Sequence, residues 1–207
     1  MKEETNYAIV RANSLHDLDE AFSCGLINLY QDIFSDPPYE EYFSDDDVIS
    51  MFRSYFEKEI ETSLVLFTYL EREIIAFCMA VPLNERWLDF EIIDFNKNTS
   101  HNCHDYFKSN FNSTSENTWY LDDLGVRKDS RRRGIAKCLL QSCLTELSSK
   151  NVFLRTSDSN NKAPLLYQNL GFSSIDGIFT LVSQKRLDGS VREDRRIIML
   201  RQAGYVD

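Results

Sequence analysis

The spacing of hydrophobic residues along the chain predicts helices that alternate with short strands. Apolar positions recur at helical intervals from Ser14 to about Phe34 and from Ser44 to about Ile60, and a third such stretch begins at Ile135. Strand-like runs occupy residues 7–11, 63–70, 74–81, 120–126, 151–156, 179–183 and 197–200. The first helix is expected to end before Pro37, because a proline disfavours helical backbone in the residue before it.

Residues 82–117 do not fit this alternation. The two strands before them are predicted to form a hairpin, and about 35 residues then separate that hairpin from the next strand, far more than a usual loop contains. Aromatic residues stand among many asparagines there, without a glycine, so we expect some local structure. A flap over a binding site, a dimer surface and a decoration of the fold are all open interpretations.

The most informative stretch is residues 120–147, where a strand, a tight basic turn and a helix follow one another. Gly134 lies where the helix begins, and a glycine there lets a phosphate approach the unpaired N–H groups of the first helical turn. The turn before it carries five cations in an otherwise acidic chain: Arg127, Lys128, Arg131, Arg132 and Arg133. The stretch therefore predicts a cradle for a pyrophosphate group. One glycine is a weak signal, and a solvated basic loop is the alternative.

The spacing in this turn resembles a known motif. Arg131-x-x-Gly134-x-Ala136, after a strand that ends Leu124-x-Val126, is similar to the acyl-CoA pyrophosphate motif of the GNAT superfamily, the acyl-CoA-dependent N-acyltransferases. A second family motif is matched at the expected distance by the run Asn160-x-x-Ala163-x-x-Leu166-Tyr167-x-x-x-Gly171-Phe172. The two motifs cover roughly residues 118–172, and together they are more specific than either alone.

The resemblance implies a fold. It implies a single GNAT-like domain over residues 1–207, of the α/β (α+β) class, with an atypical insertion at about 82–117. The central sheet would be mixed and mostly antiparallel, with about six or seven strands flanked by helices. The strand, helix and strand from residue 120 to 156 favour a parallel pair, and in the family these two strands splay apart around the pantetheine arm. Gly125 is the kind of residue that permits such a close approach.

The resemblance also implies the coenzyme site and one catalytic residue. Tyr167 would lie near the coenzyme sulfur and donate a hydrogen bond to the leaving thiolate, whereas packing beside Phe172 is its structural alternative. Asn160 would bind the coenzyme arm, and backbone N–H groups near Leu124 would stabilise an oxyanion. The residues carried over to coenzyme binding are Leu124, Val126, Arg131, Arg132, Arg133, Gly134, Ile135, Ala136, Asn160 and Ala163.

An amine acceptor needs a base, because an amine with a pKa of about 10.4 is almost fully protonated at neutral pH. The segment that begins at Tyr120 with Tyr-Leu-Asp-Asp resembles the Tyr-Leu-Glu-Asp segment of the polyamine acetyltransferase branch, and its first acid matches Asp122. Asp122 is therefore the candidate base, or the end of a proton wire. Asp123 would face the opposite side of the strand. An ion pair with an arginine of the turn is the alternative for either carboxylate.

In GNAT enzymes the loop between the first two helices helps to form the acceptor pocket. The candidate substrate-binding residues are Phe34, Tyr39, Glu40 and Asp123. For any one residue of this loop, hydrophobic packing or a solvated acidic face is an equally good explanation.

Composition narrows the function further. The 207 residues, 43% of them hydrophobic, can bury one substantial core. A net charge of −10 argues against non-specific binding to nucleic acid or an anionic membrane and favours a cationic small molecule. No apolar run reaches the length of a signal core or a membrane span, so a cytoplasmic protein is expected. The five cysteines include no C-x-x-C pair, which predicts free thiols.

A metal site is not expected. His101 and His104 could share a helix face, but no second ligand pair accompanies them. The sequence therefore predicts an N-acetyltransferase that moves an acetyl group from acetyl-CoA to a small cationic amine in a ternary complex. A non-catalytic acyl-CoA-binding or sensing domain and a protein or peptide N-acetyltransferase are the alternatives. The acyl length, the acceptor and a homodimer are left open.

Overall fold

A computed structural model describes residues 7–37, 39–56, 63–84, 88–157 and 162–204. They form two compact units. The first contains residues 1–80, 123–143 and 185–189, and the second contains the remainder of the chain. Four elements contribute residues to both units: β3 (Glu73–Pro82), β6 (Thr118–Val126), α5 (Ile135–Glu146) and β8 (Ser173–Lys185). The single domain over residues 1–207 stays a prediction.

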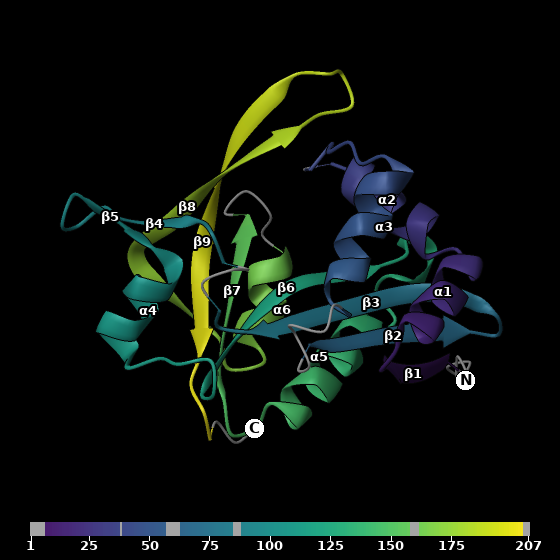
Figure 1. The fold of residues 1–207 in the computed structure, drawn as a ribbon, viewed down its shortest axis with the longest axis horizontal. Coiled ribbons are helices and arrows are strands. Elements are labelled where there is room, and N and C mark those ends of the chain that lie inside the picture. The colour runs from purple at the N-terminus through teal and green to yellow at the C-terminus, as the bar shows by residue number, and fades with distance from the viewer. Residues whose placement is uncertain (1–6, 38, 57–62, 85–87, 158–161, 205–207) are drawn as a thin grey trace. The chain divides into compact units, whose positions relative to one another are not determined.

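The first unit packs helices on an antiparallel part of the sheet. Its other elements are β1 (Tyr7–Ala12), α1 (Leu15–Ser23), α2 (Leu26–Ser35), α3 (Asp45–Ser54) and β2 (Leu64–Leu70). β2 pairs with β1 and with β3 (Figure 1). Tyr30 of α2 stacks on Phe77 of β3, with ring centroids 5.5 Å apart, and Phe52 of α3 contacts the same ring at 5.9 Å. This aromatic contact fixes α2 and α3 on β3.

The prediction of one helix from Ser14 to Phe34 is wrong. The segment forms two helices that are separated at Cys24 and Gly25. Gly25 has φ +94°, a left-handed conformation that most L-residues avoid, and the amide of Cys24 donates to the carbonyl of Glu20. The end before Pro37 is confirmed, because α2 stops at Ser35.

The start of the second predicted helix is confirmed. Ser44 caps α3, and it forms a capping box in which Ser44 Oγ accepts from the amide of Asp47 and the Asp47 carboxylate accepts from the amide of Ser44. Helix α3 ends at Ser54. The rest of the stretch that was predicted to be helical reaches residues 57–60, which lie outside the described residues.

The second unit is built around β7 (Asn151–Ser157), β8 (Ser173–Lys185) and β9 (Val191–Arg201), with α6 (Lys162–Gln168) beside β7. Residues 152–157 of β7 pair with β9 in antiparallel fashion. Residues 118–121 of β6 pair with residues 151–154 of β7 in parallel, which confirms the predicted parallel pair. That pairing covers four residues of each strand, although β6 continues to Val126 and β7 to Ser157.

The insertion at 82–117 has regular structure. It forms β4 (Glu91–Asp94), β5 (Thr99–Asn102) and α4 (Cys103–Phe111). β4 pairs with β8 on one side and with β5 on the other (Figure 1). Phe107 of α4 stacks on Phe153 of β7 at 3.9 Å. The mixed sheet therefore has nine strands within the described residues. Seven of them correspond to the predicted strand-like runs, and the other two are β4 and β5 of the insertion.

Gly125 is required by packing in the first unit. A Cβ at this buried position of β6 would collide with the ring of Phe77 and with Cδ1 of Ile33. We expect Gly125→Ala to lower the free energy of unfolding by about 1–3 kcal/mol, the usual cost of overpacking, as measured by urea unfolding. The Phe77→Leu change makes room, so the double variant should lose less than the sum of the single losses. Strictly additive losses would show that the Phe77 ring is not what the new methyl group meets.

All five cysteines are free thiols, and they differ in exposure. Cys138 is exposed, whereas Cys78, Cys103 and Cys143 are fully buried. Burial raises the pKa of Cys103 to about 12, so its reactive thiolate form is scarce near neutral pH. At about pH 8, where an ordinary thiol is partly ionised, iodoacetamide should modify Cys138 well before the three buried cysteines. Peptide mass spectrometry reads the order, and denatured protein, in which all five should react, is the control.

Candidate active site

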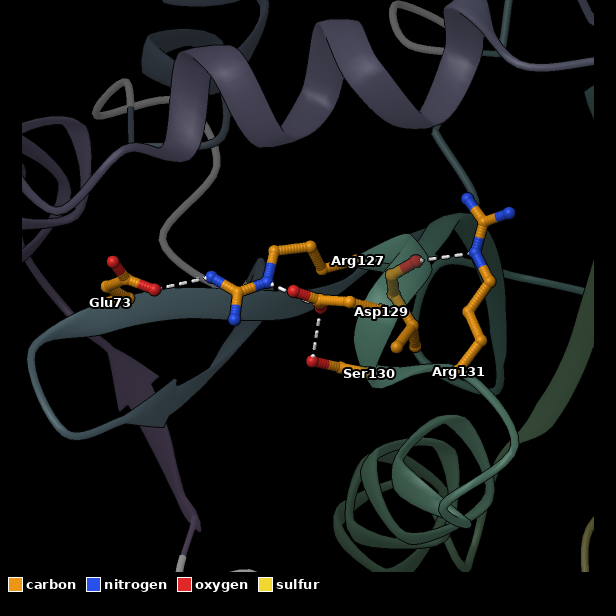
Figure 2. Close-up of polar contacts among 6 residues, drawn as sticks. Glu73, Arg127, Asp129, Ser130 and Arg131 are labelled. Carbon is orange, nitrogen blue, oxygen red and sulfur yellow. Dashed lines mark hydrogen bonds and ion pairs between the residues drawn. The ribbon is translucent and has the colours of Figure 1, made fainter.

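The turn between β6 and α5 is stabilised by its own polar residues. Arg127 donates to the carboxylates of Glu73 at 2.6 Å and Asp129 at 2.8 Å, and Ser130 donates to Asp129 at 2.8 Å (Figure 2). Arg131 Nε donates to the carbonyl of Val126 at 2.9 Å. Figure 2 shows the side chains of Arg127 and Arg131 pointing away from each other. Arg127 therefore has a structural role in holding the turn on β3.

The backbone of the turn opens toward the helix start. Arg132 has φ +65° and Gly134 has φ +83°, and α5 begins at Ile135, as the sequence predicted. Nothing lies within 4 Å of the position that a Cβ on Gly134 would take. The run from Arg131 to Gly134 is exposed. Alternating left-handed residues before a helix turn successive N–H groups inward, the arrangement that binds anions.

Asp36 connects the end of α2 to this turn. Its carboxylate lies 3.0 Å from Lys128 Nζ and 3.3 Å from an Arg131 guanidinium nitrogen. The hydrogen bond from Lys128, with a smaller contribution from Arg131, lowers the pKa of Asp36 below its ordinary value. Two cations of the turn are thus paired with a carboxylate of the segment that follows α2.

Two of the four predicted substrate-binding residues, Phe34 and Asp123, contact the side chain of Tyr30, and a third, Tyr39, contacts Phe34. The hydroxyl of Tyr30 donates to Asp123 at 3.0 Å. The Tyr30 ring lies 4.5 Å from that of Phe34, which in turn lies 5.5 Å from Tyr39. Glu40, the fourth residue, is exposed with φ +51°. The spacing of Tyr30 and Phe34, four residues apart on one helix, was the available signal for this group.

The segment after α2 is also fixed by the turn between β8 and β9. The amide of Leu187 donates to the carbonyl of Glu40 at 3.0 Å, and the amide of Tyr42 donates to the carbonyl of Lys185 at 2.9 Å. Lys185 Nζ lies 4.6 Å above the Tyr42 ring. Gly189 makes this turn with φ +81°, and no local pattern in the sequence indicates its contact with the segment after α2.

In the second unit, the predicted base stands near a buried polar group. Arg155 Nε donates to the hydroxyl of Tyr120 at 2.8 Å, and its guanidinium lies 3.9 Å above the Phe90 ring. Burial would lower the pKa of Arg155, but the Tyr120 hydroxyl and the Asp122 carboxylate outweigh this effect and the pKa is raised. Asp122 is half-buried. Sequence reasoning missed Arg155, whose charge inside an apolar strand was the available signal.

Tyr167 is also in the second unit. It lies in α6 and is buried, with its ring 5.8 Å from that of Phe172 at 65°. Ala163 is in the first turn of the same helix, and Asn160 lies outside the described residues. Leu124 and Val126 are in the second half of β6, half-buried and buried respectively, and Ile135 and Ala136 open α5. The contact with Phe172 holds the Tyr167 ring in place without using its hydroxyl.

Neither a metal centre nor a membrane span is present in the part of the chain that the structure describes. Within those residues no group of three or more His, Cys, Asp or Glu side chains is close enough to hold a metal ion. Every described helix is too short or too polar to cross a bilayer.

Comparison with known proteins gives one family and a recurrent fold. The family described as acetyltransferase (GNAT) matches residues 25–172. An N-acetyltransferase from Staphylococcus aureus Mu50 superposes with a TM-score of 0.60 at 15% identity, covering 95% of this chain and 98% of its own. The ribosomal-protein-S18-alanine N-acetyltransferase from Escherichia coli superposes with a TM-score of 0.56 at 16% identity, covering 98% of this chain and 97% of its own.

A third structure was solved with a ligand. The protein yncA from Salmonella typhimurium, solved with its cofactor acetyl-CoA, superposes with a TM-score of 0.59 at 14% identity, over 98% of this chain and 96% of its own. At these identities the likeness establishes the fold alone. Among curated proteins, none matches the chain significantly.

Proposed function

The chain belongs to the GNAT family of acetyltransferases, and from this premise we propose that it transfers the acetyl group of acetyl-CoA directly to the primary amine of a small cationic acceptor. The observation that carries the proposal is the backbone at Arg132–Gly134. Its two left-handed residues and the open space beside Gly134 lie at the start of a twelve-residue helix. That geometry suits a pyrophosphate, and yncA, which has the same fold, was solved with acetyl-CoA.

The residues of the turn fit the coenzyme. The exposed side chains of Arg131, Arg132 and Arg133 would offer positive charge, and the amides of Ile135 and Ala136 would donate from the first turn of α5. When bound, acetyl-CoA would supply an activated thioester. Leu124 and Val126 of β6 and Ala163 of α6 are proposed to line its arm, together with Asn160.

The group around Tyr30 fits a cationic acceptor. Asp123 offers a carboxylate, and Phe34 and Tyr39 present aromatic rings, whose faces attract ammonium groups. Because Tyr30 already donates to Asp123, the carboxylate is held in one orientation. The net charge of −10 attracts the same class of ligand over a longer range.

Asp122 and Tyr167 are proposed as the catalytic pair. Asp122 would accept a proton from the acceptor ammonium, directly or through water, so that the amine becomes nucleophilic. Tyr167 would donate a hydrogen bond to the leaving sulfur. Arg155 lies within electrostatic reach of Asp122 and is proposed to hold that carboxylate in position.

The test is thiol release from acetyl-CoA with a panel of polyamines, aminoglycosides, amino acids and short peptides. We expect turnover with one class of small amine, and none with its fully N-methylated analogue, which keeps the charge but has no proton to lose. Turnover with peptides alone would replace the small acceptor with a peptide. Calorimetric binding of coenzyme A without turnover for any amine would favour a sensing domain, and no binding would refute the proposal.

A further inference from the structure

Asp36 binds two cations of the turn that is proposed to hold the pyrophosphate. Its carboxylate lies 3.0 Å from Lys128 Nζ and 3.3 Å from a terminal nitrogen of Arg131. The side chains of Lys128 and Arg131 are 78% and 39% exposed, so a ligand can reach both cations. All three residues belong to the first unit. The chain therefore supplies this turn with a negative charge of its own.

The carboxylate of Asp36 competes with an anionic ligand for these cations. The hydrogen bond from Lys128 holds the pKa of Asp36 below its ordinary value, so the carboxylate is ionised at neutral pH. A pyrophosphate linkage brings two phosphate groups, and hence more negative charge than one carboxylate. Like charges beside the same two cations repel each other. Asp36 and a pyrophosphate therefore do not share Lys128 and Arg131 without a loss of binding energy.

Arg131 keeps its place on the turn without Asp36, whereas the Asp36 carboxylate depends on the two cations. Arg131 Nε donates to the carbonyl of Val126 at 2.9 Å, which holds the guanidinium against the end of β6 (Figure 2). Among the described residues, the carboxylate of Asp36 accepts hydrogen bonds from Lys128 and Arg131 alone. When a pyrophosphate occupies the turn, the carboxylate is the group that is released.

A movement of Asp36 reaches the proposed acceptor group through the backbone. The carbonyl of Asp36 accepts from the amide of Tyr39 at 3.1 Å and from that of Glu40 at 3.3 Å. The ring of Tyr39 lies 5.5 Å from that of Phe34. The two aromatic residues proposed to bind the acceptor thus flank Asp36 in the chain and contact each other.

We propose that the coenzyme pyrophosphate displaces Asp36 from Lys128 and Arg131, and that this exchange repositions Tyr39 for the acceptor. The inference rests on the proposed function and adds a coupling between its coenzyme and acceptor sites. Asp36 opposes coenzyme binding, and the bound coenzyme changes the group that meets the acceptor. Because such coupling is reciprocal, the acceptor changes the affinity for the coenzyme by the same factor.

The first test is calorimetric titration of the full chain with coenzyme A. Asp36→Asn removes the competing charge and keeps the size of the side chain. We expect it to tighten binding about threefold to tenfold, the effect of two partly exposed ion pairs. The matched control is Glu73→Gln, which removes the same charge from Arg127, whose side chain points away from Arg131 (Figure 2). It should leave the affinity unchanged, because exposed charges are screened over distance by salt.

The outcomes separate this inference from the proposed function. If Asp36→Asn binds coenzyme A no more tightly than the unchanged chain, or if both variants tighten binding equally, the displacement of Asp36 is wrong. If the unchanged chain does not bind coenzyme A, the proposed function is refuted, and the inference that rests on it is refuted as well.

The second test is NMR of the backbone amides in the isotope-labelled chain. Coenzyme A should shift the amides of Tyr39 and Glu40, which donate to the carbonyl of Asp36. These shifts should be much smaller in Asp36→Asn, because its side chain is not held by the cations before the coenzyme binds. The amide of Tyr42, which donates to Lys185, is the internal reference. Equal shifts at Tyr39 and Glu40 in both proteins would contradict the link to the acceptor group.

Discussion

Replacement of Tyr167 by phenylalanine is expected to lower kcat for amine acetylation by about 10²-fold, the lower range for loss of a general acid. The KM for acetyl-CoA should change little, because a hydrogen bond to the leaving sulfur strengthens only as the thiolate forms. Phenylalanine keeps the ring that packs on Phe172, so the free energy of unfolding should stay within about 1 kcal/mol. Steady-state kinetics and urea unfolding measure the two effects.

Tyr106→Phe is the matched control for this change. Tyr106 is another buried tyrosine of the second unit, in α4, and it lies outside the proposed site. The control should retain full kcat. If Tyr167→Phe also retains kcat within about twofold of the unchanged protein, well short of a general-acid effect, then the Tyr167 hydroxyl has no part in the chemistry and the residue serves packing alone.

Replacement of Gly134 by alanine is expected to weaken coenzyme A binding by about tenfold or more, because the new methyl group enters the open space through which a phosphate approaches the helix N-terminus. The variant should also lose about 1 kcal/mol of stability, since φ +83° strains an L-residue. Calorimetric titration with coenzyme A gives the first quantity, and urea unfolding gives the second.

Gly189→Ala separates the two effects of that change. Gly189 has φ +81°, and nothing lies near its Cβ position either, so the backbone strain is matched. We expect the same loss of stability and an unchanged affinity for coenzyme A. Equal losses of affinity in both variants would show that strain, and not obstruction of the turn, is responsible.

Features set by neighbouring residues could be predicted from the sequence. The end of α2 before Pro37, the capping of α3 by Ser44 and the start of α5 after Gly134 each depend on local chemistry within one or two turns. The break at Gly25 was missed, because apolar residues continue at helical spacing on both sides of it. The strand β5 was missed for another reason. It is polar, and it is a strand only because β4 lies beside it.

In the candidate site, too, local features could be predicted from the sequence and contacts between distant residues could not. The turn with Gly134 could be predicted, because a strand, a glycine and a helix follow one another in sequence. The bond from Tyr30 to Asp123 joins residues 93 positions apart, and the pairing of Asp36 with Lys128 joins residues 92 apart. No local pattern encodes such contacts. They arise when the helices pack on the sheet.

The insertion has a consequence for how the sheet ends. In the second unit β8 is followed by β4 and then by β5, a four-residue strand of Thr-Ser-His-Asn that is largely exposed. β4 pairs with β8 at residues 178 and 179, so at that point the outermost strand is the short β5 and not the thirteen-residue β8. A long, partly apolar edge is a template for strand addition from another molecule, whereas a short polar one is a poor template. At residues 178–179 of β8, the insertion thus replaces a long edge strand with a short polar one.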